Sequence, residues 1–581
     1  MISMGQTSSR GPISASTAAG SARQPKANNM SPATGTAIRI EDLGFEPPSP
    51  GSWQLDSTHH PRPVARFITQ PSATYEDPFA RGFIGSLRRY GTVILYPEYR
   101  FVDGFAYLCV RPAPEEELPR RFENAERAFE TKLWREDLRR WDEEVKPASI
   151  RAHLALQRID PGALSHDQLL EHLAACYAHL RRMFEQQYRF VAPALLPTGD
   201  FVAQIGELSG TSPAELLMLT RGSAPVSSGA EDGLEQLAEA IRDDAEAGAT
   251  LGSGDPPAEI LTALRARPGA TGAATNAYLE RVECRLIDGF EVGCPCGFEL
   301  PEVLVKAILR AVQGIDRGRS AVGETERARQ RVPSSERRRF DELLAEARAT
   351  NRLRDERSVY SSIWAMGLMR RAILAAGERL TAKGRIEEPA QLVDASYHEI
   401  VSMLRGGEGP SATELAALSR FRATYTAADA PRSLGDPPPP PPPLERLPAA
   451  AARATRGILT AVGLLFTDSE AQSEARVVRG LPASPGVYVG TARVLRGPDE
   501  LGRLRQGDVL VTPATSEAFN VVLPLLGALV TDHGGLLAHA AIVAREFGIP
   551  GVVGTRDATS IIPDGAGVRV DGTSGEVQVL S

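Results

Sequence analysis

The C-terminal part of this chain is best characterised by the sequence TDHGGLLAHAAIVAREFGIPGVVGT, which occupies residues 531–555. Residues 526–531, which lead into this stretch, are mostly apolar, as a buried strand requires. Gly534 and Gly535 then predict a turn, and an apolar helical pattern starts near His539 and stops at a Gly-Ile-Pro sequence. The pattern therefore predicts a strand, a turn and a helix whose first turn carries a histidine.

This arrangement favours anion chemistry. Glycine backbone comes close to an anion without steric cost, and the free N–H groups and dipole of a helix N-terminus attract negative charge. An imidazole beside such an anion site can form a transient phosphohistidine, so His539 is the candidate phosphoryl carrier. The alternative is that His539 only caps the helix. We expect Asp532 to orient the ring and Arg545 to hold the domain or the phosphate. His533 is a second phosphoryl acceptor by residue type, but it precedes the turn and is expected to play a supporting role.

The stretch resembles the mobile phosphohistidine domain of the phosphoenolpyruvate-utilising enzymes, which include phosphoenolpyruvate synthase, pyruvate phosphate dikinase, rifampicin phosphotransferase and phenylphosphate synthase. Residues 480–487 resemble its opening strand region, 508–513 its second strand and 570–576 its closing hairpin. The resemblance implies an α/β swivelling domain over residues 477–581, with the phosphoryl group carried at the position of His539.

Two positions depart from the family pattern. Ala538 stands where many relatives have Ser, Thr or Cys, and Leu537 stands where some plant-type dikinases have a regulatory threonine. The resemblance implies that phosphoryl chemistry survives these changes and that this mode of regulation does not.

Composition limits the classes of function. A chain of 581 residues with 42% hydrophobic content predicts two to four domains. A net charge of −8 argues against nucleic acid and anionic membranes as partners, and no run approaches the roughly 20 apolar residues of a membrane helix. Five cysteines fit a reducing compartment, and the isolated Cys294-Pro-Cys296 is interpreted as structural rather than as a metal site. We therefore expect a cytoplasmic protein without a resident metal.

Shifts in composition divide the chain into five parts. Residues 1–45 are rich in Ser, Ala, Thr and Gly and are predicted to be disordered. Residues 46–430 predict a mostly helical substrate-binding domain with a short β part, and 431–447 a proline-rich linker. Residues 448–476 predict a connecting helix, and 477–581 form the phosphohistidine domain. The expected fold class is thus a multidomain protein with a mainly α-helical body and a C-terminal α/β swivelling domain.

The proline run, Pro437 to Pro443, predicts a polyproline II rod that holds its neighbours about 20 Å apart. Its position favours a swivel between the body and the connecting helix. A passive spacer and a ligand for a proline-binding domain are the alternatives.

Several elements of the body are well marked. Capping-box patterns begin at three serines, apolar residues recur at helical spacing in two segments, and two short runs are typical of strands. The predicted features are capping boxes at Ser165, Ser212 and Ser411, helical faces over 301–313 and 366–380, and strands over 92–96 and 101–110.

The body also resembles the substrate domain of rifampicin phosphotransferase and phenylphosphate-synthase-like proteins, through residues 53–63, 278–285 and 354–360. A phosphoryl acceptor site needs cations for the moving charge and a base for the hydroxyl proton. The candidate cations are Arg354, Arg357, Arg370 and Arg371. His60 is the preferred base, with His59 second.

Each of these candidates has a structural alternative. The arginines also fit a solvated helix face, with Asp355 and Glu356 as partners. The two histidines also fit capping or core positions.

The sequence does not predict a donor site. It has no glycine-rich phosphate loop, and the phosphoenolpyruvate-binding barrel has no room because the chain ends at Ser581. By resemblance to phenylphosphate synthase, ATP and Mg²⁺ are expected on a separate ATP-grasp protein. The predicted function is transfer of a phosphoryl group from that ATP, through His539, to a hydroxyl or carboxyl group of a small molecule. The alternatives are a non-catalytic metabolite-binding regulator and a phosphocarrier to another protein.

Overall fold

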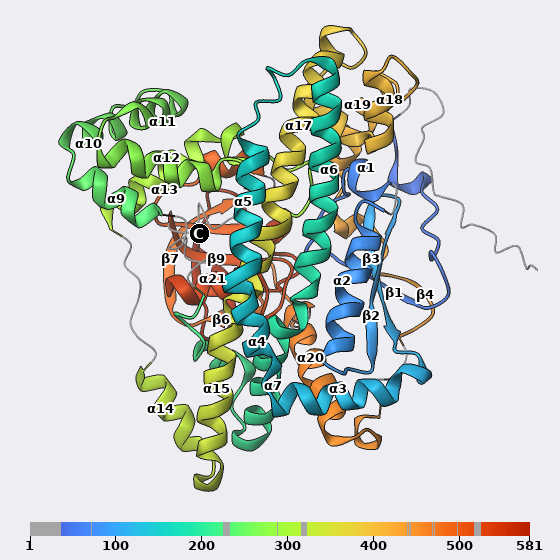
Figure 1. Ribbon diagram of the computed structural model, residues 1–581. Coiled ribbons are helices and arrows are strands. Elements are labelled where there is room, and N and C mark those ends of the chain that lie inside the picture. The colour runs from blue at the N-terminus through green and yellow to red at the C-terminus, as the bar shows by residue number, and fades with distance from the viewer. Residues whose placement is uncertain are drawn as a thin grey trace, which may run out of the picture.

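The computed structural model describes residues 37–70, 73–224, 233–287, 289–314, 322–438, 440, 443–466, 469, 471–496, 498–515 and 525–580. They form a large, mainly helical body and a smaller α/β domain that packs against it (Figure 1). This confirms the predicted fold class.

The body is built around long helices that cross its centre in Figure 1. Its helices are α1 (Arg66–Thr69), α2 (Glu76–Arg89), α3 (Leu118–Glu130), α4 (Leu133–Arg140), α5 (Lys146–Gln157), α6 (His166–Arg189), α7 (Val191–Ser209), α8 (Pro213–Met218), α9 (Leu234–Arg242), α10 (Ala245–Leu251), α11 (Pro257–Ala266), α12 (Ala270–Val282), α13 (Pro301–Gln313), α14 (Val322–Arg331), α15 (Arg337–Asn351), α16 (Leu353–Arg357), α17 (Trp364–Ala382), α18 (Tyr397–Leu404), α19 (Ala412–Thr424) and α20 (Ala449–Phe466).

Local sequence explains where several helices start. The predicted capping boxes at Ser165, Ser212 and Ser411 are confirmed at the starts of α6, α8 and α19. The predicted helix over 301–313 is confirmed as α13. The apolar pattern over 366–380 is the buried side of α17, which packs against α6. Helices α9–α13 form a lobe of their own, which stands apart at the upper left of Figure 1 and has a separate apolar core.

One four-stranded antiparallel sheet flanks the helices, in the order β2-β3-β1-β4. The strands are β1 (Ser52–Leu55), β2 (Ile94–Val102), β3 (Phe105–Pro112) and β4 (Ser433–Gly435). The predicted strands over 92–96 and 101–110 correspond to a β2–β3 hairpin whose first strand is longer and whose turn lies at residues 103–104. The other two strands were not predicted, and they tie the segment before the proline run to the start of the body.

The predicted disordered segment and linker both extend into the folded body. Residues 1–36, and within the proline run residues 439, 441 and 442, lie outside the described part of the chain. Ile38, Ile40 and Phe45 pack against the apolar cluster that contains Trp53 and Phe105, so this segment belongs to the body up to its described start. Residues 433–435 pair with β1, although they fall within the predicted linker.

The C-terminal region that is predicted to carry the phosphohistidine folds as a mixed eight-stranded sheet in the order β5-β12-β11-β7-β8-β9-β10-β6. Strands β7 to β10 are parallel in this order, and the outer pairings are antiparallel. The central strands β8 and β9 are buried because α21 covers one face of the sheet and α22 the other. The elements are β5 (Val477–Arg479), β6 (Leu481–Ser484), β7 (Val487–Val494), β8 (Asp508–Thr512), β9 (Leu526–Thr531), α21 (His539–Phe547), β10 (Gly551–Val553), α22 (Ala558–Ile561), β11 (Gly567–Asp571) and β12 (Glu576–Val579).

Helix α20 joins the two parts and packs along α7 of the body. The prediction that the proline run holds this helix away from the body is therefore wrong. The reason is a glycine contact, because Gly199 of α7 and Gly457 of α20 allow the two backbones to approach closely. Among the described residues, α20 alone has the length and hydropathy of a membrane-spanning helix, criteria that the core helix of a water-soluble protein also meets.

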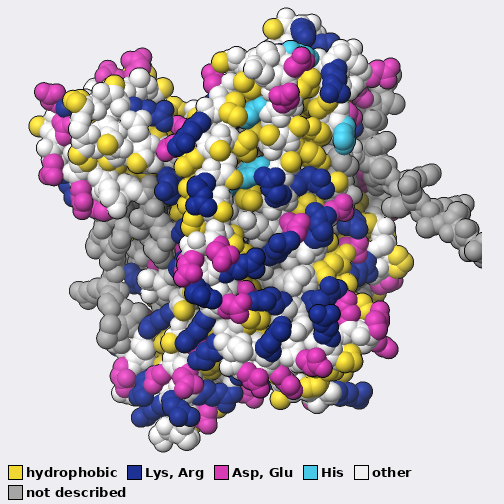
Figure 2. Space-filling model, in the orientation of Figure 1, with side chains coloured by type: hydrophobic (Ala, Val, Ile, Leu, Met, Phe, Trp, Pro, Cys, Tyr) yellow, Lys and Arg dark blue, Asp and Glu magenta, His cyan; other side chains and the backbone are white. Residues whose placement is uncertain are grey.

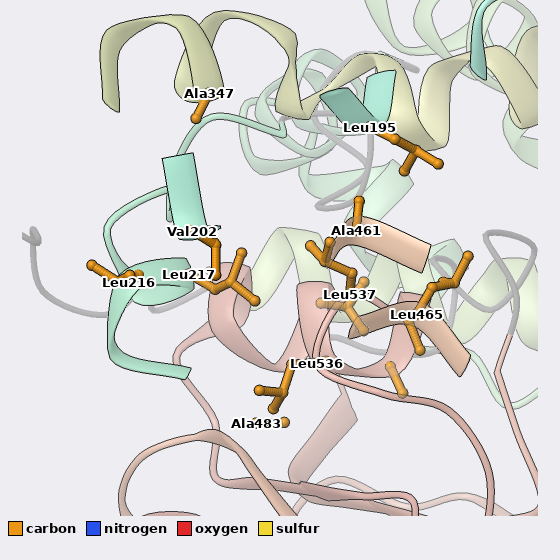
Figure 3. Close-up of a cluster of buried hydrophobic side chains, with 14 of the residues drawn as sticks. Leu195, Val202, Leu216, Leu217, Ala347, Ala461, Leu465, Ala483, Leu536 and Leu537 are labelled. Atoms are coloured by element: carbon orange, nitrogen blue, oxygen red, sulfur yellow. The ribbon is translucent and has the colours of Figure 1, made fainter. Parts of the chain in front are cut away.

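The α/β domain that contains β5 to β12 is called the mobile domain below. It docks on the body through the loop that precedes α21. Leu536 and Leu537 of this loop belong to the same apolar cluster as Val202 and Leu217 of the body and Ala461 of α20. In Figure 3, the Leu537 side chain lies next to Ala461 and Leu465. The loop is thus buried between the mobile domain, the connecting helix and the body.

Charged side chains of both signs cover the face shown in Figure 2, with Lys and Arg gathered over its middle. Arginines of the body form ion pairs, such as those of Arg352 with Asp142 and of Arg135 with Glu346. The face therefore carries mixed charge.

Candidate active site between body and mobile domain

His539 is the first residue of α21 and is buried where the mobile domain meets the body. The helix starts here because Ala538 takes an extended conformation as its N-cap. Burial lowers the pKa of His539 to about 4, while Asp355 raises it and Arg354 lowers it further. Both of these charged residues belong to α16, so the imidazole faces the body and is neutral at neutral pH.

The orientation of the ring is set by Thr515. Its hydroxyl oxygen lies 3.0 Å from Nδ1 of His539. A neutral imidazole carries one N–H, so a proton on Nδ1 that is donated to Thr515 makes Nε2 the unprotonated ring nitrogen. Sequence reasoning missed Thr515, since no pattern links it to the helix that starts 24 residues later.

The glycine turn was expected to present its backbone N–H groups to an anion, but at least one of them is already used. Gly535 N–H donates to the carbonyl oxygen of Leu465 at 2.9 Å, and Leu537 N–H donates to that of Leu464 at 2.8 Å. These acceptors lie in the last turn of α20, where helix carbonyls lack intrahelical partners. Gly534 has a φ of +104°, which favours glycine. The turn thus fastens the mobile domain to the connecting helix.

Asp532 and Arg545 form hydrogen bonds that brace the mobile domain. Asp532 accepts hydrogen bonds from the backbone N–H and the hydroxyl of Thr559, and burial raises its pKa. The prediction that Asp532 orients His539 is therefore wrong. Arg545 donates to the carbonyl oxygens of Ala483 and Leu536, and burial lowers its pKa to about 10. Of the two roles expected for Arg545, it has the first, which is to hold the domain.

Two adjoining cavities, with volumes of about 130 and 250 Å³, lie beside this interface. His59 and His60 form part of the wall of both. The first cavity is mostly apolar, with Arg354 and Arg357 among its few charged residues. The second is more polar and is bounded on the mobile-domain side by residues 512–515. His539 lines neither cavity itself, but its partner Thr515 lines the second.

The four candidate arginines divide into two pairs. Arg354 and Arg357 line the first cavity, where Arg354 donates to Asp355 at 2.8 Å and Arg357 to the carbonyl oxygen of Gln187 at 3.3 Å. Their role as cations near a moving phosphoryl group stays a prediction. Arg370 instead forms a bidentate ion pair with Glu299, at 2.7 and 2.8 Å, and lines neither cavity. Arg371 donates to the carbonyl oxygen of Gln157 at 2.6 Å. Arg370 and Arg371 line neither cavity, so the structure does not bring these two candidates to the others.

The two candidate histidines differ in their surroundings. His60 is packed edge-on against Tyr75, Tyr99 and Phe101, and burial lowers its pKa to about 4. His59 is partly exposed, and its Nδ1 lies 2.9 Å from a carboxylate oxygen of Asp56. His59 is therefore the better candidate for the base, ahead of the predicted His60, because of the two only His59 has a carboxylate that fixes its ring.

Two known families match parts of this chain. Residues 504–575 match the family described as "PEP-utilising enzyme, mobile domain", and residues 201–379 match the "Rifampicin phosphotransferase fourth domain". The first match includes His539 and Thr515, and the second includes Arg354 and Arg357.

Individual relatives agree with these matches. The chain is 28% identical to chondramide synthase of Chondromyces crocatus over 83% of its own length and 13% of that protein. It is 29% identical to rifampicin phosphotransferase of Streptomyces sviceus, over 56% of the chain and 36% of the relative. It is 50% identical to phosphoenolpyruvate synthase of Aeropyrum pernix, over 19% of the chain and 14% of the relative.

The chain spans less than half the length of each of these relatives. It is nevertheless similar to these proteins in two separate parts, since residues 504–575 match the mobile-domain family and residues 201–379 match the rifampicin phosphotransferase fourth domain.

Proposed function

We propose that this chain is a phosphotransferase component in which His539 carries a phosphoryl group to a small molecule bound in the body. The observation that carries the proposal is the placement of one neutral imidazole, with Nδ1 held by Thr515, against Arg354 and Asp355 of the body. Nε2 is then the nucleophile that accepts the phosphoryl group. Two relatives named rifampicin phosphotransferase match 56% and 70% of the chain, which supports this proposal.

The docked position of the mobile domain is used in the second half of the reaction, in which the phosphoryl group passes from His539 to the acceptor. Breaking the P–N bond places negative charge on the phosphoryl oxygens as they move, and a guanidinium near them stabilises that charge. Arg354 and Arg357 are the cations positioned for this role. The cavities beside His539 also favour a small-molecule acceptor over a protein acceptor, which disfavours a phosphocarrier.

We place ATP and Mg²⁺ on a separate ATP-grasp protein and the complex in the cytoplasm. Among the described residues, no group of three His, Cys, Asp or Glu side chains is placed to hold a metal ion. The relatives named as phosphotransferases extend well beyond the segments that match, which leaves room in them for a donor domain. When bound on the partner, the ion would neutralise charge on the ATP phosphates.

To reach that donor, the mobile domain has to leave the body. A swing about the proline run would pull α20 away from α7, whereas a rotation of the mobile domain relative to α20 leaves that packing intact. We therefore infer that α20 stays with the body, and that the two hydrogen bonds to Leu464 and Leu465 break when the mobile domain leaves.

Labelled ATP tests the proposal. The chain is incubated with γ-labelled ATP and Mg²⁺, with and without a candidate ATP-grasp protein. We expect acid-labile, base-stable label that needs the partner and is lost in His539→Asn. No label under any condition would favour a regulatory protein, and label without the partner would place the donor site on this chain.

A further inference from the structure

His59 and Asp56 form a hydrogen-bonded dyad in the loop after β1. Nδ1 of His59 lies 2.9 and 3.2 Å from the two carboxylate oxygens of Asp56. Tyr99 donates its hydroxyl proton to the same carboxylate at 2.8 Å, and the backbone N–H of His59 donates at 3.0 Å. Asp56 is 2% exposed. These contacts fix the carboxylate, and the carboxylate in turn fixes the imidazole.

The dyad sets the tautomer of His59. Because an ionised carboxylate only accepts hydrogen bonds, Nδ1 of His59 carries the proton and Nε2 carries the lone pair. Burial raises the pKa of Asp56, but the neighbouring His59 and its hydrogen bonds outweigh burial and keep that pKa below its ordinary value. Within the described part of the chain, nothing is hydrogen-bonded to Nε2 of His59. The ring lines both cavities and touches Phe290 and Phe466 edge-on.

The dyad lies next to the phosphohistidine loop. Thr58, which precedes His59, is so close to the glycine turn that a Cβ atom on Gly534 would lie 3.7 Å from its methyl group. Thr58 and His59 line the same cavity as Thr515, the partner of His539. An acceptor in this cavity would therefore lie between Thr515, which holds His539, and the basic nitrogen of His59.

We propose that His59, held by Asp56, is the general base of the acceptor half-reaction and that the acceptor is an alcohol or phenol rather than a carboxylic acid. A carboxylic acid is already ionised at neutral pH and needs no base, whereas a hydroxyl group must lose its proton as it attacks. The apolar wall of the first cavity fits an acceptor with an aromatic or aliphatic body. This inference rests on the proposed function of His539.

In the transfer step, the hydroxyl oxygen of the acceptor bonds to phosphorus while the bond from phosphorus to Nε2 of His539 breaks. The electron pair of that bond returns to Nε2 of His539, which becomes neutral because its proton stays on Nδ1. The hydroxyl proton passes to Nε2 of His59, and Asp56 stabilises the imidazolium. Asp56 is a positioning residue because it acts through His59.

The test starts from chain charged at His539 by potassium phosphoramidate, which makes it independent of any partner protein. His539→Asn gives the background of label on other histidines. Release of the phosphoryl group is followed to 2-naphthol, to 2-naphthoate and to water, in wild type and in His59→Asn, His59→Gln and Asp56→Asn. His166→Asn is the matched control, because His166 is an exposed residue of the body. Circular dichroism confirms that each variant folds.

We expect His59→Asn and His59→Gln to slow transfer to 2-naphthol about 10²-fold or more, as for loss of a general base. Asp56→Asn should slow it less and change the pH profile of release, which a merely structural role would not do. His166→Asn should match wild type. Equal rates in wild type and the His59 variants, no release to 2-naphthol or water in wild type, or 2-naphthoate as the better acceptor would each overturn the inference. If His539→Asn is labelled as strongly as wild type, the proposed function fails, and the base fails with it.

Discussion

Gly199 of α7 and Gly457 of α20 meet where the connecting helix crosses the body, and a Cβ atom on Gly199 would lie 1.9 Å from the carbonyl oxygen of Gly457. The two helices pack at backbone distance because neither residue has a side chain. The connecting helix is thereby fixed to the body, and its last turn receives the loop that carries His539.

Gly199→Ala should therefore destabilise the body. The added methyl group has no room against a backbone carbonyl, and overpacking of a tight core costs about 1–3 kcal/mol. Gly463→Ala is the matched control, because a methyl group added at Gly463 of α20 would meet no atom within 4 Å. This control should be neutral or stabilise by about 0.4–1 kcal/mol. Urea unfolding measures both, and equal midpoints for the two variants would contradict this packing.

Thr515→Val should lower the rate at which His539 takes up a phosphoryl group. The variant keeps the shape of the side chain but removes the hydrogen bond to Nδ1, and one such bond contributes about 1 kcal/mol, or roughly fivefold in rate. Thr515→Ser keeps the hydroxyl and should retain most of the activity. Uptake of label from γ-labelled ATP in the presence of the partner is the measurement. If the Val and Ser variants behave alike, the hydroxyl does not orient the ring.

The β9–turn–α21 region could be predicted because its signals are local. Apolar residues mark the strand, and Gly548 ends the helix in a left-handed conformation at the expected place. The placement of the arginines could not be predicted, because the acceptor that removes Arg370 from the site is Glu299, which comes from a different segment. The His59–Asp56 contact has a local spacing, but the hydroxyl that completes it belongs to Tyr99 on β2, so the sequence did not distinguish His59 from its neighbour.

Arg370 and Arg354 should respond differently to substitution. Arg370→Met breaks a largely buried bidentate pair and leaves Glu299 uncompensated, which should cost about 3 kcal/mol of stability. Uptake of label per folded molecule should be unchanged. Arg354→Lys keeps the charge but loses the planar guanidinium group and its paired N–H donors. It should slow transfer to the acceptor about tenfold or more. Thermal unfolding and single-turnover transfer separate the two effects, and loss of transfer in folded Arg370→Met would return that residue to the site.

Docking of the mobile domain should depend on pH through two groups with opposite effects. His539 has a docked pKa of about 4, set by burial, with Asp355 and Arg354 facing it. When the domain swings out, its pKa returns toward the ordinary value near 6.5. The undocked state then binds more protons between these values, so acidification from pH 6.5 to 4 weakens docking through His539.

Glu546 acts in the other direction. Its carboxylate accepts a hydrogen bond from Gly222 N–H of the body at 2.9 Å, and burial raises its pKa to about 7 despite the opposing effect of that bond and of Arg545 and Arg221. The docked state therefore binds more protons between the ordinary value near 4.5 and pH 7, and acidification in this window strengthens docking. Each group contributes on the order of 1–3 kcal/mol, so the two largely cancel in the wild type.

Single substitutions should separate these effects. Between pH 7 and 5, Glu546→Gln should open on acidification, because only His539 remains to titrate. His539→Asn should close more tightly, and the double variant should show little dependence on pH. The radius of gyration from small-angle X-ray scattering reports the open fraction, with His166→Asn as the control for loss of a histidine elsewhere. If Glu546→Gln and His539→Asn change in the same direction as the pH falls, the mobile domain does not bury these two groups against the body when it docks.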